Sequence, residues 1–177
     1  MDVVWFKKDL RTRDHAPLLS ASLSGSPVIC LFILEPERLE LDDIDPIHVQ
    51  WELDCATDLS VALKALGADL HFAVGDAVSV MEDFDKRYGI GRLLSHEETG
   101  NSWSFQRDKR VLSWCRNKGI EWAEYPHNGV VRRLGTRDEW KRRRDKRMKE
   151  PLSDAPFFSE GIPVSYTHLR AHETDIN

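Results

Sequence analysis

Five acidic and amide side chains follow segments of the sequence that have the length and composition of buried β-strands: Asp9, Glu35, Glu97, Glu98 and Asn101. Carboxylate and amide oxygens accept hydrogen bonds, and a planar heteroaromatic ring carries N–H and amino groups that need such acceptors. We therefore expect these side chains to bind the edge of a planar ring whose faces lie against apolar strand ends. The alternative is that residues 97–101 only stabilise the N-terminus of the helix that follows them.

Two other groups of residues have types and spacings that could do chemistry, but their surroundings argue against it. The basic segment 137–149 could bind DNA phosphates or a partner domain, yet its interleaved acidic residues favour a solvated helix face. His168, His172 and Glu173 have the helical spacing of metal ligands. They lie in a polar tail without periodicity, where no second shell supports them, so we expect no metal site.

Apolar segments of strand length recur along the chain at residues 3–6, 28–34, 69–74, 90–95 and 120–125. Helical patterns separate and follow them: a first helix capped by Asp14, then residues 46–66, 76–88, 102–118 and, after a capping box of Thr136 and Glu139, 136–149. This alternation predicts an α/β fold with a five-stranded, doubly wound, parallel sheet, Rossmann-like, with helices on both faces. The five candidate residues then share the carboxyl edge of the sheet, where ligands bind at the reversal of strand order.

The turn after the first strand carries charges where a dinucleotide-binding turn carries glycines. Residues 5–18 read WFKKDLRTRDHAPL, and residues 95–103 read SHEETGNSW, followed by an Arg-Asp pair at 107–108 and a Trp-Cys pair at 114–115. Both stretches resemble the DNA photolyase and cryptochrome family of flavoproteins. Lys7 and Lys8 stand where many members of that family carry arginine.

The resemblance implies a division of the chain into three parts. Residues 1–135 correspond to the α/β antenna domain, residues 136–163 to a basic helix and linker leading to a helical FAD-binding domain, and residues 164–177 to a tail unlike the family that we expect to be disordered. In the family, FAD lies in the helical domain, and photolyases use excited reduced FAD to split pyrimidine dimers in damaged DNA. We therefore expect no catalysis from this polypeptide alone.

The resemblance also implies a cofactor for the α/β domain, an antenna pigment that is a lumazine, FMN, a deazaflavin or a folate. Asp9, Glu35, Glu97, Glu98 and Asn101 would bind it. Folate-binding members carry a glutamate shortly before the Arg-Asp pair, whereas Trp103 or Ser104 occupies that place here. A lumazine or flavin-like pigment is therefore implied at least as readily as a folate.

Two alternatives to an antenna domain remain open from the sequence. A stand-alone nucleotide-binding module of the universal-stress or electron-transfer-flavoprotein type would have a similar sheet, but only Gly100 is available in the loop after the fourth strand. The other alternative is a structural remnant that binds nothing.

The net charge of −5 argues against a protein that coats nucleic acid. Three separated cysteines in apolar segments and the lack of a long apolar run predict a cytoplasmic protein with no membrane partner.

Overall fold

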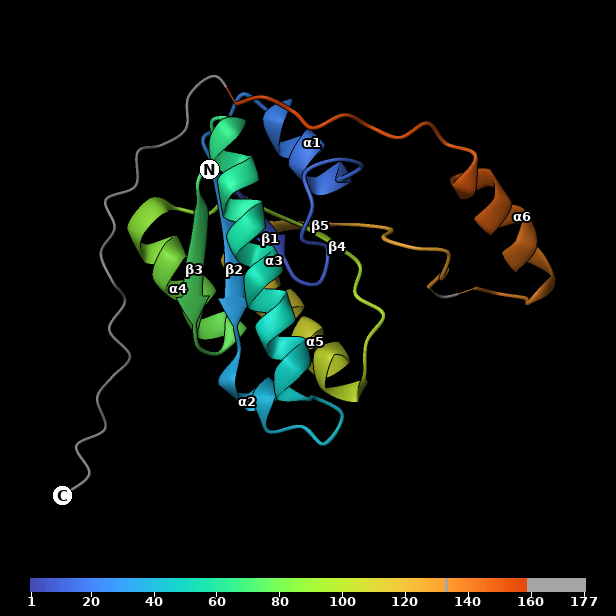
Figure 1. The fold of residues 1–177 in the computed structure, drawn as a ribbon, viewed down its shortest axis with the longest axis horizontal. Helices are drawn as coiled ribbons and strands as arrows, with labels where there is room; N and C mark the ends of the chain where they lie inside the picture. The colour runs from blue at the N-terminus through green and yellow to red at the C-terminus, as the bar shows by residue number, and fades with distance from the viewer. Residues whose placement is uncertain (133, 159–177) are drawn as a thin grey trace.

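The computed structural model describes residues 1–132 and 134–158, and a single parallel sheet lies at its centre (Figure 1). The strands are β1 (Asp2–Phe6), β2 (Val28–Leu34), β3 (Leu70–Val74), β4 (Arg92–His96) and β5 (Glu121–Tyr125). Their order in the sheet is β3-β2-β1-β4-β5, with every pair parallel. The predicted five-stranded α/β fold is thus confirmed. Strand order reverses beside β1, so the switch point lies between β1 and β4.

Helices cover both faces of the sheet, as predicted. Figure 1 labels α1 (Ala16–Ser22), the short α2 (Pro36–Leu39), α3 (Pro46–Ala65), α4 (Ala77–Tyr88), α5 (Ser102–Lys118) and α6 (Asp138–Met148). Side chains alternate along β1, so Val4 and Phe6 pack with α1 and α3, whereas Val3 and Trp5 pack with α4 and α5. All four are buried, which explains why this strand is continuously apolar.

The chain after β5 leaves the body of the domain and then returns to it. None of the residues of α6 is buried, and the helix is held to the loop after β5, where Trp140 Nε1 donates to the Gly129 carbonyl at 3.0 Å. After α6, the Asp14 amide donates to the Ser153 carbonyl and the Phe158 amide donates to the Leu66 carbonyl, both at 2.8 Å. Residues 150–158 therefore pass across the α1 and α3 side of the sheet (Figure 1).

The structure shows that two of the predicted helix starts are wrong. The N-cap of α1 is His15, whose side chain accepts from the Leu18 amide, while Asp14 has a positive φ of 50°. The last helix begins at Asp138 without a side-chain cap, and Thr136 meets Glu139 only through a backbone hydrogen bond. The predicted tail, 164–177, and its histidines lie outside the described residues.

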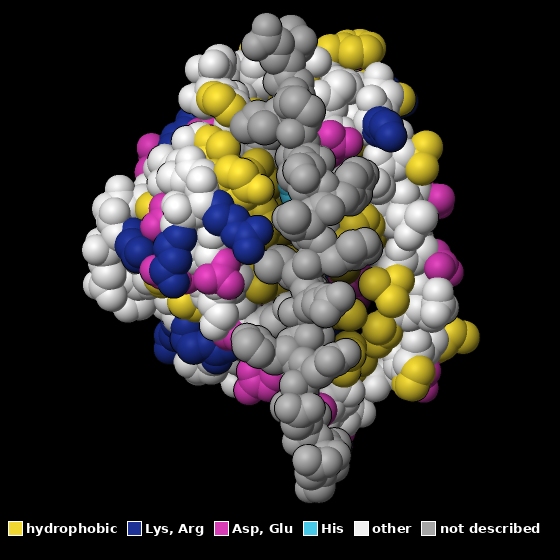
Figure 2. Space-filling model, turned by 90° about the vertical axis from the view of Figure 1, so that its left-hand side faces the viewer, with side chains coloured by type: hydrophobic (Ala, Val, Ile, Leu, Met, Phe, Trp, Pro, Cys, Tyr) yellow, Lys and Arg dark blue, Asp and Glu magenta, His cyan; other side chains and the backbone are white. Residues whose placement is uncertain are grey.

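Two features of the described residues concern the surface of the molecule. No helix among the described residues is long and apolar enough to cross a bilayer. Figure 2 shows basic and acidic side chains mixed on the face that carries β3 and α4. There, Lys86 and Lys118 pair with Glu82, and Lys118 also pairs with Asp85. The cysteines are unpaired, with Cys30 and Cys115 buried and Cys55 partly exposed.

Candidate functional site

A buried arginine on α5 organises one side of the carboxyl edge. Arg107 donates from one terminal nitrogen to Glu35 at 3.0 Å and from the other to Glu98 at 2.5 Å and to Asp108 at 2.8 Å. Glu35 follows β2 and Glu98 follows β4, so the guanidinium joins segments on both sides of β1. With their neighbours these residues form what we call the arginine cluster: Lys7, Glu35, Glu98, Trp103, Arg107 and Asp108.

The protonation of the arginine cluster follows from its burial and its internal charges. Burial by itself would raise the pKa of Glu98, but the charge and hydrogen bond of Arg107 hold that pKa below its ordinary value. At Glu35 burial prevails and raises the pKa in spite of Arg107. Burial opposes the charge of Arg107, yet Glu98, Asp108 and Glu35 together raise its pKa. The cluster therefore holds a permanent cation among acidic groups that depend on it.

Aromatic rings enclose the cations of this cluster. The Arg107 guanidinium carbon lies 4.8 Å from the ring centroid of Trp5 and 5.5 Å from that of Trp103. The Lys7 ammonium also lies over Trp5, at 4.8 Å, and its nearest carboxylate oxygen belongs to Asp108, at 3.5 Å. Burial lowers the pKa of Lys7, although Asp108 acts in the opposite direction.

Three fully buried polar side-chain atoms of the described residues have no hydrogen-bond partner: Lys7 Nζ, Arg38 Nε and Trp103 Nε1. All three are donors. They lie on segments that follow β1, β2 and β4, at the same carboxyl edge. Buried donors are normally satisfied, so this concentration of unpaired N–H groups distinguishes the edge from the rest of the described domain.

A second polar cluster lies at the other side of the end of β1, and we call it the histidine cluster: Asp9, Arg11, His15, His96 and His127. Asp9 is buried and accepts from the Lys7 amide at 2.8 Å, from His15 Nε2 at 2.8 Å and from His96 Nδ1 at 2.6 Å. The ring of His127 stacks on His96 with centroids 5.1 Å apart. The histidines, by their hydrogen bonds and charges, hold the pKa of Asp9 well below its ordinary value, although burial opposes this.

The ligand atoms of Asp9, His15 and His96 lie within 4.8 Å of one another, which is close enough to suggest a metal site. The hydrogen bonds argue against that interpretation. Because the Leu18 amide donates to His15 Nδ1 at 3.1 Å, the proton of a neutral His15 must be on Nε2, where it faces Asp9. A metal-bound imidazole needs that nitrogen free and normally donates from the other one. The histidine cluster thus fits a hydrogen-bonded support for α1 and β4.

The five predicted residues are divided among different surroundings. Glu35 and Glu98 meet at Arg107, whereas Asp9 belongs to the histidine cluster. Asn101 is the N-cap of α5, accepting from the Ser104 amide at 3.0 Å and donating to Asp43 at 2.9 Å. Glu97 is partly exposed, and its backbone amide donates to the carbonyl of Tyr125 at 2.7 Å.

Sequence reasoning did not identify Arg107 as the centre of the site, although a signal was present. The buried positions of α5 recur at steps of three and four: Ser104, Arg107, Asp108, Val111, Trp114 and Cys115. Two charged residues therefore occupy the helix stripe that faces the sheet, and charges at such positions must be paired. The partners of Asp9 carried no comparable signal. His96 lies 87 residues from Asp9, and no periodic pattern links His15 to it.

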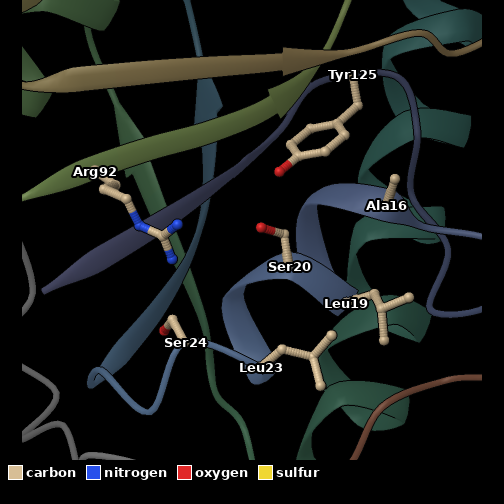
Figure 3. Close-up of a pocket in the computed structure, with 7 residues that line it drawn as sticks. All are labelled: Ala16, Leu19, Ser20, Leu23, Ser24, Arg92 and Tyr125. Carbon is tan, nitrogen blue, oxygen red and sulfur yellow. The ribbon is translucent and has the colours of Figure 1, made fainter.

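An open hollow of about 420 Å³ lies between α1, β4 and β5 (Figure 3). The hydroxyl groups of Ser20 and Tyr125 and the guanidinium of Arg92 point into it, while Leu19 and Leu23 form an apolar side. Arg92 is already paired with the carboxylate of Asp2. None of the five predicted residues lines this hollow, so the carboxyl edge remains the candidate site.

Comparisons with known proteins give one consistent result. The sequence model of the family described as DNA photolyase matches residues 2–138. A cryptochrome DASH of Gloeobacter violaceus is 27% identical over 175 residues, which is 95% of this chain and 31% of the relative. The crystal structure of a Synechocystis cryptochrome superposes with a TM-score of 0.77 at 18% identity, covering 92% of this chain and 37% of that one.

An archaeal photolyase from Sulfolobus tokodaii, described as containing two FAD molecules and as implying a novel light-harvesting cofactor, superposes with a TM-score of 0.69. It is 22% identical, and the match covers 91% of this chain and 37% of that structure. This chain therefore spans about a third of the length of these relatives.

Proposed function

Because this chain belongs to the DNA photolyase family, we propose that its α/β domain binds a planar antenna pigment at the carboxyl edge of the sheet. In the whole protein the pigment would pass excitation energy to FAD in a further domain, where light would drive DNA repair or signalling. A cytoplasmic location and partners in the form of that FAD domain and damaged DNA are parts of the same proposal.

The observation that carries this proposal is the arginine cluster at the switch point. Open α/β sheets bind ligands where strand order reverses, and here that point has two tryptophan rings, a buried guanidinium and unpaired N–H groups. Trp103 is partly exposed and offers a flat apolar surface for a ring, while Trp5 is buried and supports Lys7 and Arg107 from beneath. A light-harvesting cofactor in the archaeal photolyase supports the same role for this domain.

A pigment titration tests the proposed function. FMN, a ribityllumazine, a deazaflavin and a folate are each added to the purified protein, and binding is followed by pigment fluorescence. Replacing Glu35 or Glu98 by alanine would remove a hydrogen-bond acceptor from Arg107. Glu98→Gln is the better variant because it keeps an acceptor for Arg107. Tyr125→Phe serves as the control for binding in the hollow of Figure 3.

We expect at least one pigment to bind with one-to-one stoichiometry. Glu98→Gln should lower the affinity because it weakens the ion pair that positions Arg107, and Tyr125→Phe should leave it unchanged. A loss of binding confined to Tyr125→Phe would move the site to the hollow. If no pigment binds, the antenna role is wrong and the domain is a structural remnant. Tight binding of ATP instead would favour the stand-alone nucleotide-binding module.

A further inference from the structure

The arginine cluster has an excess of hydrogen-bond donors, and this excess bears on which class of pigment fits. Its acceptors are engaged within the protein: Glu35 and Glu98 bond to Arg107, and the amide of Asn101 bonds to α5 and to Asp43. No fully buried side-chain oxygen of the described residues lacks a partner, whereas three donor nitrogens do. The chemistry left for a ligand is therefore the opposite of the one expected from the sequence.

Two of the three unpaired donors, those of Trp103 and Lys7, lie around Arg107. Trp103 stacks against Arg107 itself. Lys7 lies on the ring of Trp5, the ring that also faces Arg107, and only 6% of Lys7 is exposed. Arg38 pairs with Glu52 through its terminal nitrogens. The charges of Glu98 and Glu35 also help to raise the pKa of Arg38. Its Nε remains unpaired.

The charges of the cluster and its rim balance, so a ligand need not bring a large charge. The cations Lys7, Lys8, Arg107 and Arg132 face the anions Glu35, Glu98, Asp108 and Glu124. A neutral ring with several hydrogen-bond acceptors therefore matches this site better than a ring with several donors.

The antenna pigments divide into two classes by this criterion. Lumazines, flavins and deazaflavins carry carbonyl oxygens at both C2 and C4 of the pyrimidine ring, so that edge presents two acceptors around one N–H group. Pterins, including folates, carry an amino group at C2, which turns one of the acceptors into a donor. A donor placed against a buried donor leaves both unpaired.

On the basis of the proposed function, we infer that this site selects a pyrimidine-2,4-dione pigment, of the lumazine, flavin or deazaflavin class, over a 2-amino-4-oxo pterin. The indole N–H of Trp103 and the ammonium group of Lys7 donate to the carbonyl oxygens of the pigment. Both side chains must turn toward the ring for this; neither donor gives up a hydrogen bond, although Lys7 moves away from its 3.5 Å ion pair with Asp108. The preference therefore follows from donors that gain partners only when the pigment binds.

The test compares lumazine with pterin, two fluorescent bicyclic rings that differ in the C2 substituent and in the proton that lumazine carries on N1. One mismatched hydrogen bond predicts that lumazine binds about ten- to hundredfold more tightly than pterin. FMN and folate form a second pair, for the case in which side chains of the pigment contribute most of the affinity. Equal affinities within both pairs, or tighter binding of the pterins, would overturn the inference and leave the antenna function standing.

Two variants locate the preference in the proposed donors. Trp103→Phe keeps a ring beside Arg107 but removes the unpaired N–H, and we expect it to reduce the lumazine-to-pterin ratio about tenfold. Trp122→Phe is the matched control, because the N–H of Trp122 already donates to the Ser95 hydroxyl at 3.1 Å. Lys7→Met tests the second donor and replaces Trp103→Phe if that variant fails to fold, as judged by circular dichroism.

The outcomes separate the two proposals. A ratio that falls in Trp103→Phe or Lys7→Met and stays unchanged in Trp122→Phe supports the inference. A dione preference that neither variant alters would show that other groups select the pigment, and would overturn the assignment of the donors. If none of the four compounds binds to the wild-type protein, both this inference and the antenna function fail.

Discussion

The two polar clusters at the end of β1 both join charged side chains from several segments, but they differ in how completely their hydrogen bonds are satisfied. In the histidine cluster, Asp9 receives three hydrogen bonds and no fully buried side-chain atom lacks a partner. In the arginine cluster the carboxylates are satisfied, while Lys7 and Trp103 each have a donor without an acceptor. This difference is what we expect if the histidine cluster supports the fold and the proposed pigment completes the arginine cluster.

The largest expected effect comes from removing the centre of the arginine cluster. Arg107→Met leaves the carboxylates of Glu35, Glu98 and Asp108 buried without their counterion, and we expect a loss of about 3–5 kcal/mol in the free energy of unfolding. Urea unfolding followed by tryptophan fluorescence measures this loss. The control is Arg110→Met, on the same helix but exposed, for which a change within about 1 kcal/mol is expected. Equal losses in both variants would contradict the central position of Arg107.

A smaller loss is expected from the corresponding change in the histidine cluster. Asp9→Asn keeps an oxygen acceptor but removes the charge that receives the protons of His15 and His96, at a cost of about 1.5–3 kcal/mol. The exposed pair of Asp154 and Arg13 provides the control Asp154→Asn, with almost no change expected. Pigment affinity measured on folded Asp9→Asn should equal that of the wild type. A large loss of affinity would mean that the histidine cluster also binds the ligand.

The histidine cluster should make the fold sensitive to mild acid. Burial lowers the pKa of both His96 and His127 from 6.5, although Asp9 opposes this in each case. Other charges near these rings are those of Arg11, of Arg147 on α6 and, once protonated, of His15. Between the unfolded pKa and the lower folded one, the unfolded chain binds more protons, so stability falls as the pH falls through that window.

We expect the free energy of unfolding to decrease from about pH 7 to about pH 5, with a slope of up to about 1.4 kcal/mol per pH unit for each histidine involved. Asp9 stays ionised throughout, because its own pKa lies well below this range. Urea unfolding at a series of pH values measures the slope. His127→Gln should make the slope shallower, and an unchanged slope would show that His127 takes no part.

The smallest effect on stability is expected at Lys7. Its ammonium group is buried, lacks a hydrogen bond and lies 3.5 Å from an Asp108 oxygen that Arg107 and Arg132 also neutralise. Because burial lowers the pKa of Lys7, holding its charge at neutral pH has a cost that offsets the ion pair. Lys7→Met should therefore change the unfolding free energy by less than about 1 kcal/mol. A loss comparable to that of Arg107→Met would show that Lys7 already serves the fold.

The architecture could be predicted from the sequence because it depends on local patterns. Apolar runs such as Val28–Leu34 and the glycine after α5 are properties of short segments, and they set the strands and helices of the sheet. Helix starts were less predictable, since the cap of α1 depends on how His15 is held by Asp9. That contact depends on a tertiary arrangement which no local pattern encodes.

The meeting of Glu35 and Glu98 at one edge of the sheet was predictable, but the hydrogen bonds made there were not. The position of Glu35 and Glu98 after strands predicted their meeting at one edge, and the structure brings both to Arg107. Arg107 on α5 engages these two acceptors. It lies 72 residues after Glu35 in the sequence, so no local pattern shows the contact. A sequence shows which groups are present at an edge, whereas the hydrogen bonds show which remain for a ligand.

Nuclear magnetic resonance of the six tryptophan indole N–H groups tests most directly the proposal that a ligand completes the arginine cluster. The protein is labelled with nitrogen-15, the resonances are assigned with single Trp→Phe variants, and lumazine or FMN is added. The Trp103 indole resonance should move downfield as it gains an acceptor, while that of Trp122, already bonded to Ser95, should remain in place. Binding of the pigment with an unmoved Trp103 resonance, or a shift confined to Trp122, would contradict the assignment of the ligand to the arginine cluster.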